Sequence, residues 1–502
     1  MQQLTAREAS FLYADTTQAN SNITFVQIYD QSTAPGGHVR FKSILAHIEN
    51  RLHRSTVFRS KLLHVPLALD KPYWVHDENF DLEYHVRHSA LPKPGDWRQF
   101  CIQASRIHAR ALDLHRPLWE IYVIEGLDSI TDLPPGSFAL LTKIHHSAID
   151  VASRNDFLDV LHDSTRKPPK PEPPEPWFPE RAPGAGPLLL RAGLNLALTP
   201  FKLMDPLLRV APKAKAFLRD LTKPDSHGSP TRFNTVVSSH RVFDTRRFLD
   251  SEFERIRGLV PGATLNDAVV AVCAGGLRSY LELHGELPET DLEGVVPHSL
   301  DATQAARPAP GVAGATGAPQ RITLGTHLPD AVKRLAWIRD QTEAPPAPSA
   351  RRPTPASCTV THVVGPPTAV YLHGARMSYF SAILPIADGK GLVFAVTHYD
   401  GRIVISPTSC RELMPDPQVF TQCVRDTFQD YLALAPPAKR VVPRKKSVAS
   451  RAKTTTPASL KKARPGESAT GKSSPRVRRA GTAAKPLQAV TASRRRSTAP
   501  RR

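Results

Sequence analysis

The chain is predicted to be a mixed α/β protein, because strand-like segments alternate with segments of helical periodicity along both of its halves. A proline-rich stretch separates the two halves, and a long basic stretch follows the second half. Even without that basic stretch, residues 1–436 are too many for one ordinary hydrophobic core, so the length favours two domains. We therefore expect two domains built of α/β layers.

The strands and helices of this prediction come from the spacing of apolar residues. Short apolar runs rich in β-branched and aromatic residues predict strands at residues 24–29, 119–124, 138–144, 393–397 and 402–405. Apolar residues that recur every three to four positions predict helices at residues 41–51, 97–111, 151–161, 265–284, 330–342 and 417–432.

Composition places the domain boundaries. Nine prolines between residues 166 and 187 exclude regular structure there and predict a stiff, extended connector. The next segment, residues 187–210, has leucines interspersed with Arg191, Lys202 and Arg209, which fits either an interfacial helix on a membrane or a helix packed on the protein's own core. We expect domains at residues 1–165 and 231–436, joined by a linker with this amphipathic segment at residues 166–230.

Positive charge is concentrated at the C-terminal end. The chain has 66 Lys+Arg and 46 Asp+Glu, but residues 437–502 alone hold 20 of these basic residues and one acid, Glu467. This tail has no aromatic residue and cannot bury enough apolar surface to offset its chain entropy, so it is predicted to be disordered. Clustered Lys and Arg favour contact with anionic lipid or nucleic acid, and a solvated tail without a partner is the alternative.

Several classes of protein are disfavoured by the motifs that the chain lacks. Its five cysteines are widely spaced without a metal-ligand pattern, so no metal site is expected. The sequence has no HExxH, Walker A or GxSxG motif, which weakens the metalloprotease, nucleotide-hydrolase and serine-hydrolase interpretations. Residues 1–10 lack the apolar core of a signal peptide, and no apolar run has the length of a membrane-spanning helix. We expect a cytoplasmic protein.

The most informative motif is His145-His146-Ser147-Ala148-Ile149-Asp150, which falls between the predicted strand at residues 138–144 and the predicted helix at residues 151–161. A strand-to-helix turn can hold an imidazole at the edge of a cleft, with a carboxylate close enough to select its tautomer. That arrangement suits a general base for an alcohol or amine nucleophile. Because the chain has 20 histidines, a purely structural pair is the alternative.

Several ordered segments resemble the bacterial wax ester synthase/diacylglycerol acyltransferase family, particularly its actinobacterial members. The HHxxxD motif is one of them. The others are residues 4–12, FDLEYHVR at residues 80–87, PLWE at 117–120 with EGL at 125–127, GATLNDAVVA at 262–271, VGPP at 364–367 with YL at 371–372, YDG at 399–401 and PD at 415–416.

This resemblance implies two chloramphenicol acetyltransferase-like domains, each with a mixed sheet and helices, and an active site in a channel between them. It implies an acyl-CoA-dependent O-acyltransferase that acts on diacylglycerol, with a fatty alcohol as the alternative acceptor and with acyl-CoA as co-substrate rather than any bound cofactor. His146 would be the general base, His145 would support it, and Asp150 would hold the turn through a basic partner. Asn266 is the candidate oxyanion donor, with Asp267 beside it in the substrate site, although a helix N-cap is the alternative role for both.

The resemblance also implies a protein associated peripherally with a membrane or lipid droplet. The sequence departs from the family pattern at Val151, where the family has glycine, and in the short proline-rich link of about twenty residues that follows the helix predicted at residues 330–342. A catalytically weak relative that binds lipid therefore remains an alternative, as does a nucleic-acid-associated protein whose contacts are made by the tail.

Overall fold

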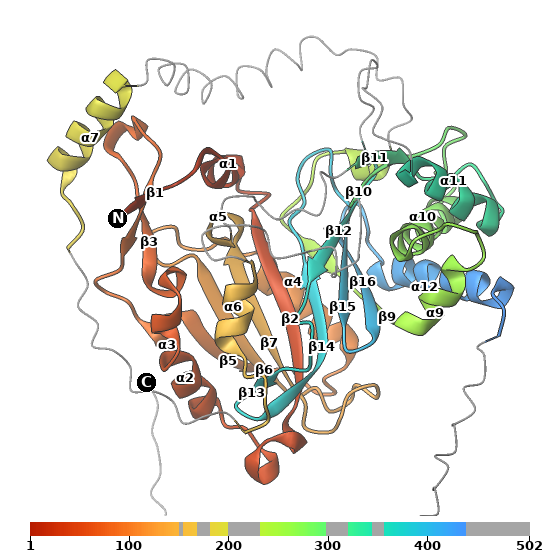
Figure 1. Cartoon of the computed structure of the whole chain (residues 1–502), viewed down its shortest axis with the longest axis horizontal. Helices are drawn as coiled ribbons and strands as arrows, with labels where there is room; N and C mark the ends of the chain where they lie inside the picture. Colours follow the sequence, from red (N-terminus) through yellow and green to blue (C-terminus); the bar gives the residue numbers. More distant parts are fainter. Residues whose placement is uncertain (150–153, 168–180, 199–230, 298–319, 344–355, 438–502) are drawn as a thin grey trace, which may run out of the picture. The chain divides into compact units, whose positions relative to one another are not determined.

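Three β-sheets organise the part of the chain that the structure describes (Figure 1). The computed structural model describes residues 1–149, 154–167, 181–198, 231–297, 320–343 and 356–437. Residues 1–439 form one compact unit. The prediction of a mixed α/β fold with a mixed sheet in each half is confirmed, because both large sheets combine parallel and antiparallel pairs.

The first large sheet carries the HHxxxD segment. Only its edge pair, β5 with β6, is parallel. Its strand order is β13 (Tyr371–Leu372), β14 (Ala375–Ile383), β2 (Asn22–Asp30), β7 (Phe138–His145), β6 (Trp119–Glu125) and β5 (Val86–Ala90).

The second large sheet is built from residues 241–410. Its strand order is β11 (Gln320–Thr323), β10 (Glu293–Val296), β12 (Cys358–Val364), β15 (Val393–Tyr399), β16 (Arg402–Cys410) and β8 (Arg241–Phe243), and β9 (Arg246–Leu249) also pairs with β16. A small antiparallel sheet joins β1 (Gln2–Gln3), β4 (Tyr73–His76) and β3 (Ser60–Leu63).

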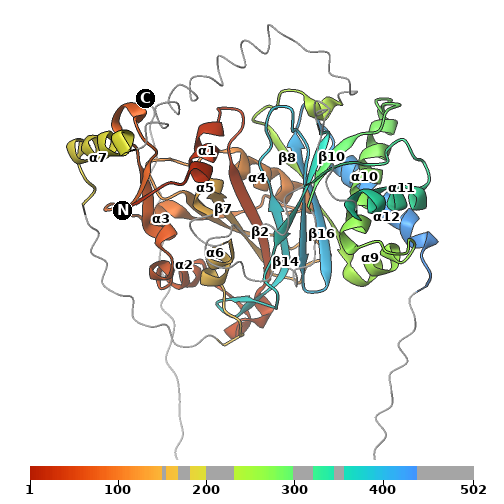
Figure 2. The same cartoon turned by 45° about the horizontal axis from the view of Figure 1, so that its top comes forward.

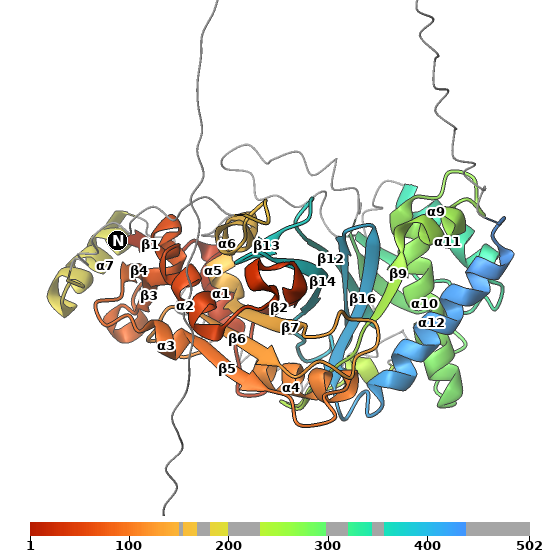
Figure 3. The ribbon, with the colours of Figure 1, turned by 90° about the horizontal axis from the view of Figure 1, so that it is seen from below.

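Helices cover both sheets (Figures 2 and 3). On one face of the first sheet lies α4 (Trp97–Ala109), and on the other lie α2 (Phe41–Glu49) and α6 (Arg154–Leu161). The second sheet is covered by α9 (Asp250–Arg257), α10 (Leu265–Leu283), α11 (Ala331–Glu343) and α12 (Pro417–Leu434). The remaining helices are α1 (Ala6–Ala14), α3 (Leu82–His85), α5 (His146–Ile149) and α7 (Ala185–Leu198). None of the helices in the described ranges combines the length and the apolar character needed to cross a membrane.

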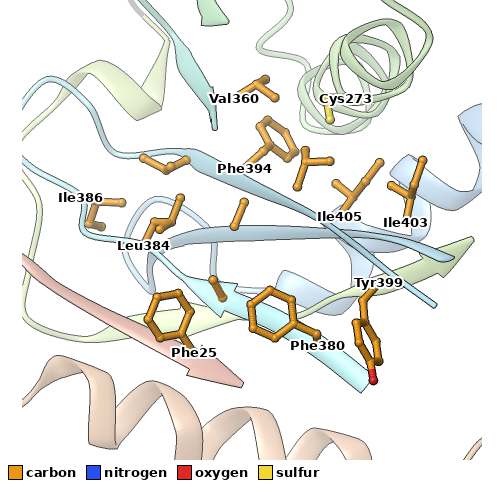
Figure 4. Packing of buried hydrophobic residues seen from close by; sticks show 14 of the residues in the cluster. Phe25, Cys273, Val360, Phe380, Leu384, Ile386, Phe394, Tyr399, Ile403 and Ile405 are labelled. Carbon is orange, nitrogen blue, oxygen red and sulfur yellow. The ribbon is translucent and has the colours of Figure 1, made fainter. Parts of the chain in front are cut away.

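The two large sheets meet along β14, which comes from the second half of the chain but pairs with β2 of the first half. Figure 4 shows Phe380 of β14 between Phe25 of β2 and the strands of the second sheet. The rings of Phe380 and Phe25 stack with centroids 6.1 Å apart, and the Tyr399 ring lies 6.5 Å from Phe380 on the other side. Because this contact is apolar and buried, it holds the two halves together by the hydrophobic effect.

The predicted helices and strands all fall on observed ones, mostly within a few residues of their ends. The structure adds several short strands that the apolar pattern did not reveal, among them β3, β4, β8 and β9. The domain boundaries at residues 165 and 230 stay predictions, since they border the ranges 168–180 and 199–230, which lie outside the described residues. The predicted disordered tail also lies outside them, from residue 438 onward.

The prediction of an extended connector up to Pro187 is wrong at its end, because α7 begins at Ala185. Pro187 is the third residue of this helix. In the first turn, a proline forfeits no intrahelical hydrogen bond, since the N–H groups there have no partner in the helix. Within α7, Leu188 and Ala192 are buried, so the described part of the amphipathic segment does pack on the protein's own core.

A buried carboxylate, Asp244, joins three elements that are distant in sequence. The indole N–H of Trp97 in α4 donates to its Oδ1 over 2.8 Å, and Arg246 pairs with its Oδ2 at 3.1 Å. The hydroxyl of Thr421 in α12 also donates to Oδ2. Asp244 is 1% exposed, so its negative charge depends on these donors for its solvation.

We predict that Asp244→Ala lowers the free energy of unfolding by about 3 kcal/mol or more, because it removes a buried charge and leaves its donors without an acceptor. Chemical denaturation followed by circular dichroism measures this loss. The matched control is Glu254→Ala, which removes a half-exposed ion pair with Arg257 and should cost less than about 1 kcal/mol. Equal losses in the two variants would contradict the assigned role of Asp244.

Candidate active site

The two adjacent histidines lie where β7 ends and α5 begins, as the sequence predicted. His145 is the last residue of the strand and is paired with Asn22 of β2. The backbone N–H of His145 donates to Leu118 O over 3.0 Å, and that of His146 donates to Ser21 O over 2.9 Å. The turn is therefore held by the backbone on both sides. Asp150, the third predicted residue of the motif, lies outside the described residues, as does Val151.

The ring of His145 is buried, with both nitrogens engaged. Its Nδ1 lies 3.2 Å from the backbone N–H of Ser147 and 2.7 Å from the Ser147 hydroxyl. Since a backbone N–H can only donate, Nδ1 is the acceptor and Nε2 carries the hydrogen. Nε2 lies 3.1 Å from a carboxylate oxygen of Asp15, to which it donates. With its tautomer set in this way, His145 is a structural residue of the turn.

His146 is half-buried, whereas His145 is only 1% exposed. Its ring stacks on Phe11 of α1, with centroids 3.8 Å apart and planes inclined by 16°. Stacking restricts the rotation of the imidazole. Of the two adjacent rings, His146 is the less buried.

The segment formed by α1 and the following loop, residues 5–21, supports this turn. Thr5 and Glu8 form a capping box that starts α1, and Asp15 is the residue at which the helix ends. One oxygen of Asp15 accepts from the Ser21 N–H over 2.8 Å, while the other holds His145. The sequence analysis did not identify Phe11 or Asp15 as site residues. The signal available was the family-like opening at residues 4–12, which precedes Asp15 and carries no obvious chemistry.

Behind the turn, β7 carries a fully buried lysine, Lys143, two residues before His145 and on the same face of the strand. Its ammonium group lies 3.5 Å from Glu120, which also accepts a hydrogen bond from the Tyr122 hydroxyl over 2.9 Å. Burial lowers the pKa of Lys143 from 10.5 to about 8, against the opposing effect of the Glu120 carboxylate. The strand that leads into the turn therefore carries a lysine whose positive charge is destabilised by burial.

On the opposite face of the sheet, a neutral polar network anchors the end of α6. The Thr142 hydroxyl donates to Gln27 over 3.0 Å, and the Tyr29 hydroxyl lies 2.6 Å from Nε2 of His162. Nδ1 of His162 lies 2.6 Å from Leu158 O and must donate to it, so Nε2 accepts from Tyr29. Burial lowers the pKa of His162 to about 4, which keeps the ring neutral. This network fixes the helix that follows the HHxxxD segment.

The second-half candidates, Asn266 and Asp267, lie in the first turn of α10 and are both buried. Asp267 accepts from the Thr264 N–H and from the Thr342 hydroxyl, each over 2.7 Å. Asp267 therefore takes part in capping α10, as the alternative predicted, although the N-cap residue itself is Thr264. The side-chain amide of Asn266 donates to Pro297 O over 3.0 Å, and its oxygen has no hydrogen-bond partner among the described residues. Its role as an oxyanion donor stays a prediction.

The buried lysine predicts a pH dependence of stability. Because the pKa of Lys143 is about 8 in the folded protein and near 10.5 in the unfolded chain, the unfolded state binds more protons between these values. The contribution of this residue to stability should thus rise by up to about 3 kcal/mol as the pH increases from 8 to 10.5. Denaturation of the wild type and of Lys143→Met across this range measures it. Parallel curves for the two proteins would contradict the prediction.

Matches to known proteins cover most of the chain. Residues 4–269 match the wax ester synthase/diacylglycerol acyltransferase catalytic domain, and residues 346–431 match the WS/DGAT C-terminal domain. A protein of Mycobacterium tuberculosis named "Putative diacyglycerol O-acyltransferase" is 30% identical over 457 residues, which cover 83% of this chain and 87% of that protein. The O-acyltransferase WSD of Acinetobacter baylyi is 27% identical over 405 residues, covering 71% of this chain and 82% of that protein.

A solved structure supports the same assignment at the level of the fold. The wax ester synthase/diacylglycerol acyltransferase from Marinobacter aquaeolei superposes with a TM-score of 0.61 at 22% identity, covering 86% of this chain and 99% of that protein. The matched regions contain all strands of the first large sheet, those of the second except β10 and β11, and the turn at His145 and His146. The chain belongs to the wax ester synthase/diacylglycerol acyltransferase family.

Proposed function

We propose that this protein is an acyl-CoA-dependent O-acyltransferase that transfers a long-chain acyl group to diacylglycerol and forms triacylglycerol, with His146 as the general base. The observation that carries this proposal is the pair of histidines at the end of β7, within a chain that belongs to the family. His145 is engaged by Ser147 and Asp15, and His146 is half-buried and stacked on Phe11.

The proposed reaction requires a general base but no nucleophile on the enzyme. An alcohol with a pKa near that of water attacks a thioester slowly at neutral pH, and removal of its proton in the transition state accelerates the attack by about a hundred- to ten-thousand-fold. His146 takes the hydroxyl proton as the new carbon–oxygen bond forms. The carbon–sulfur bond then breaks, and the same imidazole returns the proton to the sulfur of CoA, so no covalent enzyme intermediate is required.

The surroundings of His146 suit this role. The backbone N–H of His146 is bonded to Ser21 O and its ring is stacked, so the imidazole is positioned before substrate binds. His145 keeps the turn rigid because its Nε2–H donates to Asp15. Positioning of this kind lowers the entropy lost on reaching the transition state, which makes the α1 segment part of the proposed catalytic apparatus through its contact with both histidines.

The developing oxyanion requires hydrogen-bond donors, and Asn266 remains the candidate in the second half. Its amide nitrogen has two hydrogens, and the Pro297 carbonyl accepts one of them. A fatty alcohol in place of diacylglycerol is the second candidate acceptor, because the same base would serve either hydroxyl and the family name covers both products. We further propose that the protein works at the surface of a membrane or lipid droplet, where both acceptors would be dissolved.

We predict that His146→Ala lowers the rate of CoA release from long-chain acyl-CoA and diacylglycerol by about a hundred- to ten-thousand-fold, because the base is lost. A thiol assay with purified protein and a panel of diacylglycerols and fatty alcohols measures this rate and ranks the acceptors. The control is His115→Ala, since His115 is 89% exposed and should leave the rate unchanged. A His146→Ala variant that matches the wild type would exclude His146 as the base.

Asp15 provides a test of positioning. We predict that Asp15→Ala lowers kcat about ten- to a hundred-fold with little change in KM, because the turn loses the acceptor that holds His145. Asp15→Asn retains one oxygen, which can accept from His145 but not at the same time from the Ser21 N–H, so it should lose less activity than Asp15→Ala. The thiol assay gives both constants, and thermal melting of each variant separates this effect from unfolding. Similar losses of kcat in the Ala and Asn variants would show that the charge, rather than the hydrogen bond, is what matters.

A further inference from the structure

Five leucines from two separate segments are exposed at one place on the first half of the protein. Three belong to α7 and two to the turn at residues 66–69 between β3 and β4. We call them the leucine patch: Leu67, Leu69, Leu189, Leu190 and Leu194. Leu67 is 86% exposed and Leu190 is 68% exposed, so these side chains are held in water rather than at the margin of the core.

The inner side of α7 shows why the leucines of this helix point outward. Leu188 and Ala192 are buried against Val65 and Tyr73. Asn195, one turn further along the same side, donates from its amide to Asp70 over 2.8 Å. Because residues 188, 192 and 195 form one stripe of the helix, residues 190 and 194 lie on the opposite side. A helix that is apolar on both sides is expected only where each side has a partner.

The turn at residues 66–69, beside α7, has an unusual backbone conformation and exposes Leu67. Leu67 and Ala68 have φ values of 58° and 52°, in the left-handed region that residues other than glycine disfavour. The N–H of Ala68 donates to Val65 O over 3.1 Å, which closes the turn. The same Val65 packs against Leu188 of α7, so the two segments are fixed to each other. A strained turn that exposes a leucine beside an apolar helix is consistent with a binding role for both.

The charged residues beside the leucine patch bear on the kind of partner it can bind. The α7 helix contains no acidic residue, and its only charged residue is the exposed Arg191. The segment at residues 65–71 contains one base, Lys71, and one acid, Asp70, which is 7% exposed and bonded to Asn195. Exposed apolar side chains flanked by basic residues match a lipid layer with anionic headgroups, whereas a protein partner would normally add polar contacts of both signs.

We propose that the leucine patch is the face by which this protein docks on an anionic lipid layer. The leucines enter the boundary between headgroups and acyl chains, and Arg191 and Lys71 lie at the level of the headgroups. This docking role rests on the proposed function, because it assumes an acceptor that is dissolved in lipid. Its test measures binding alone and therefore gives a result whether or not the acyltransferase activity is found.

The test is flotation of the full-length protein with phosphatidylcholine vesicles that contain phosphatidylglycerol. The basic tail could also bind these vesicles, so the measurement is repeated at about 1 M salt, where the Debye length falls to about 3 Å and electrostatic binding is screened. At high salt the wild type should still float. The double variant Leu190→Glu/Leu194→Glu should lose at least about tenfold in its partition coefficient, because two apolar side chains are replaced by anions.

The matched control is Leu283→Glu, at a leucine that is 65% exposed at the end of α10 and outside the patch. It should bind vesicles like the wild type, and thermal melting should show that all the variants are folded. Equal flotation of the double variant and the control would overturn the proposal, and so would complete loss of wild-type binding at high salt. If the wild type instead forms a dimer in sedimentation that the double variant lacks, with flotation unchanged, the patch binds a second copy and the proposal is wrong.

Discussion

The fold and the candidate site both depend on β2, which is hydrogen-bonded to a neighbouring strand along each of its two edges. One edge of this strand is bonded to β14 from the second half of the chain, and the other is bonded to β7, which ends at the two histidines. The same strand brings Asn22 opposite His145, and the residue before it, Ser21, accepts the backbone N–H of His146. Because every backbone group in a central strand must be paired, a slip of β2 would disturb the union of the halves and the candidate site together.

The histidines illustrate how burial assigns roles to identical side chains. Burial lowers the pKa of His47 and His108 to about 3 and that of His162 to about 4, so these rings stay neutral inside the first half. His108 and His162 form hydrogen bonds with Thr24 and Tyr29 of β2, and His47 of α2 bonds to Leu161 O at the end of α6. His145 likewise has both nitrogens engaged by Ser147 and Asp15. His146 is half-buried and stacked on Phe11, and we assign the proton transfer to it because it is the less buried ring of the HHxxxD pair.

Two features of different origin would bring this protein to lipid. The basic tail can act only through charge, and its attraction weakens with salt over the Debye length. The leucine patch can act through burial of apolar surface, which salt does not screen. A protein whose proposed acceptor is dissolved in a lipid layer gains from both, because the charge would raise the rate of encounter and the leucines would hold a defined face toward the layer.

The sequence alone determined most of the longer elements and the family, because apolar periodicity and ordered motifs are local properties that a linear pattern can carry. It located the strand-to-helix turn at His145 and His146 and the capping alternative for Asp267. It did not reveal that β14 would join the sheet of the first half, or that Asp15 would hold His145 from 130 residues away. It also left open which leucines of α7 face the protein's own core, and the structure buries Leu188 and exposes Leu190. Such contacts depend on how distant segments pack, and only the tertiary structure decides which side of each helix finds a partner.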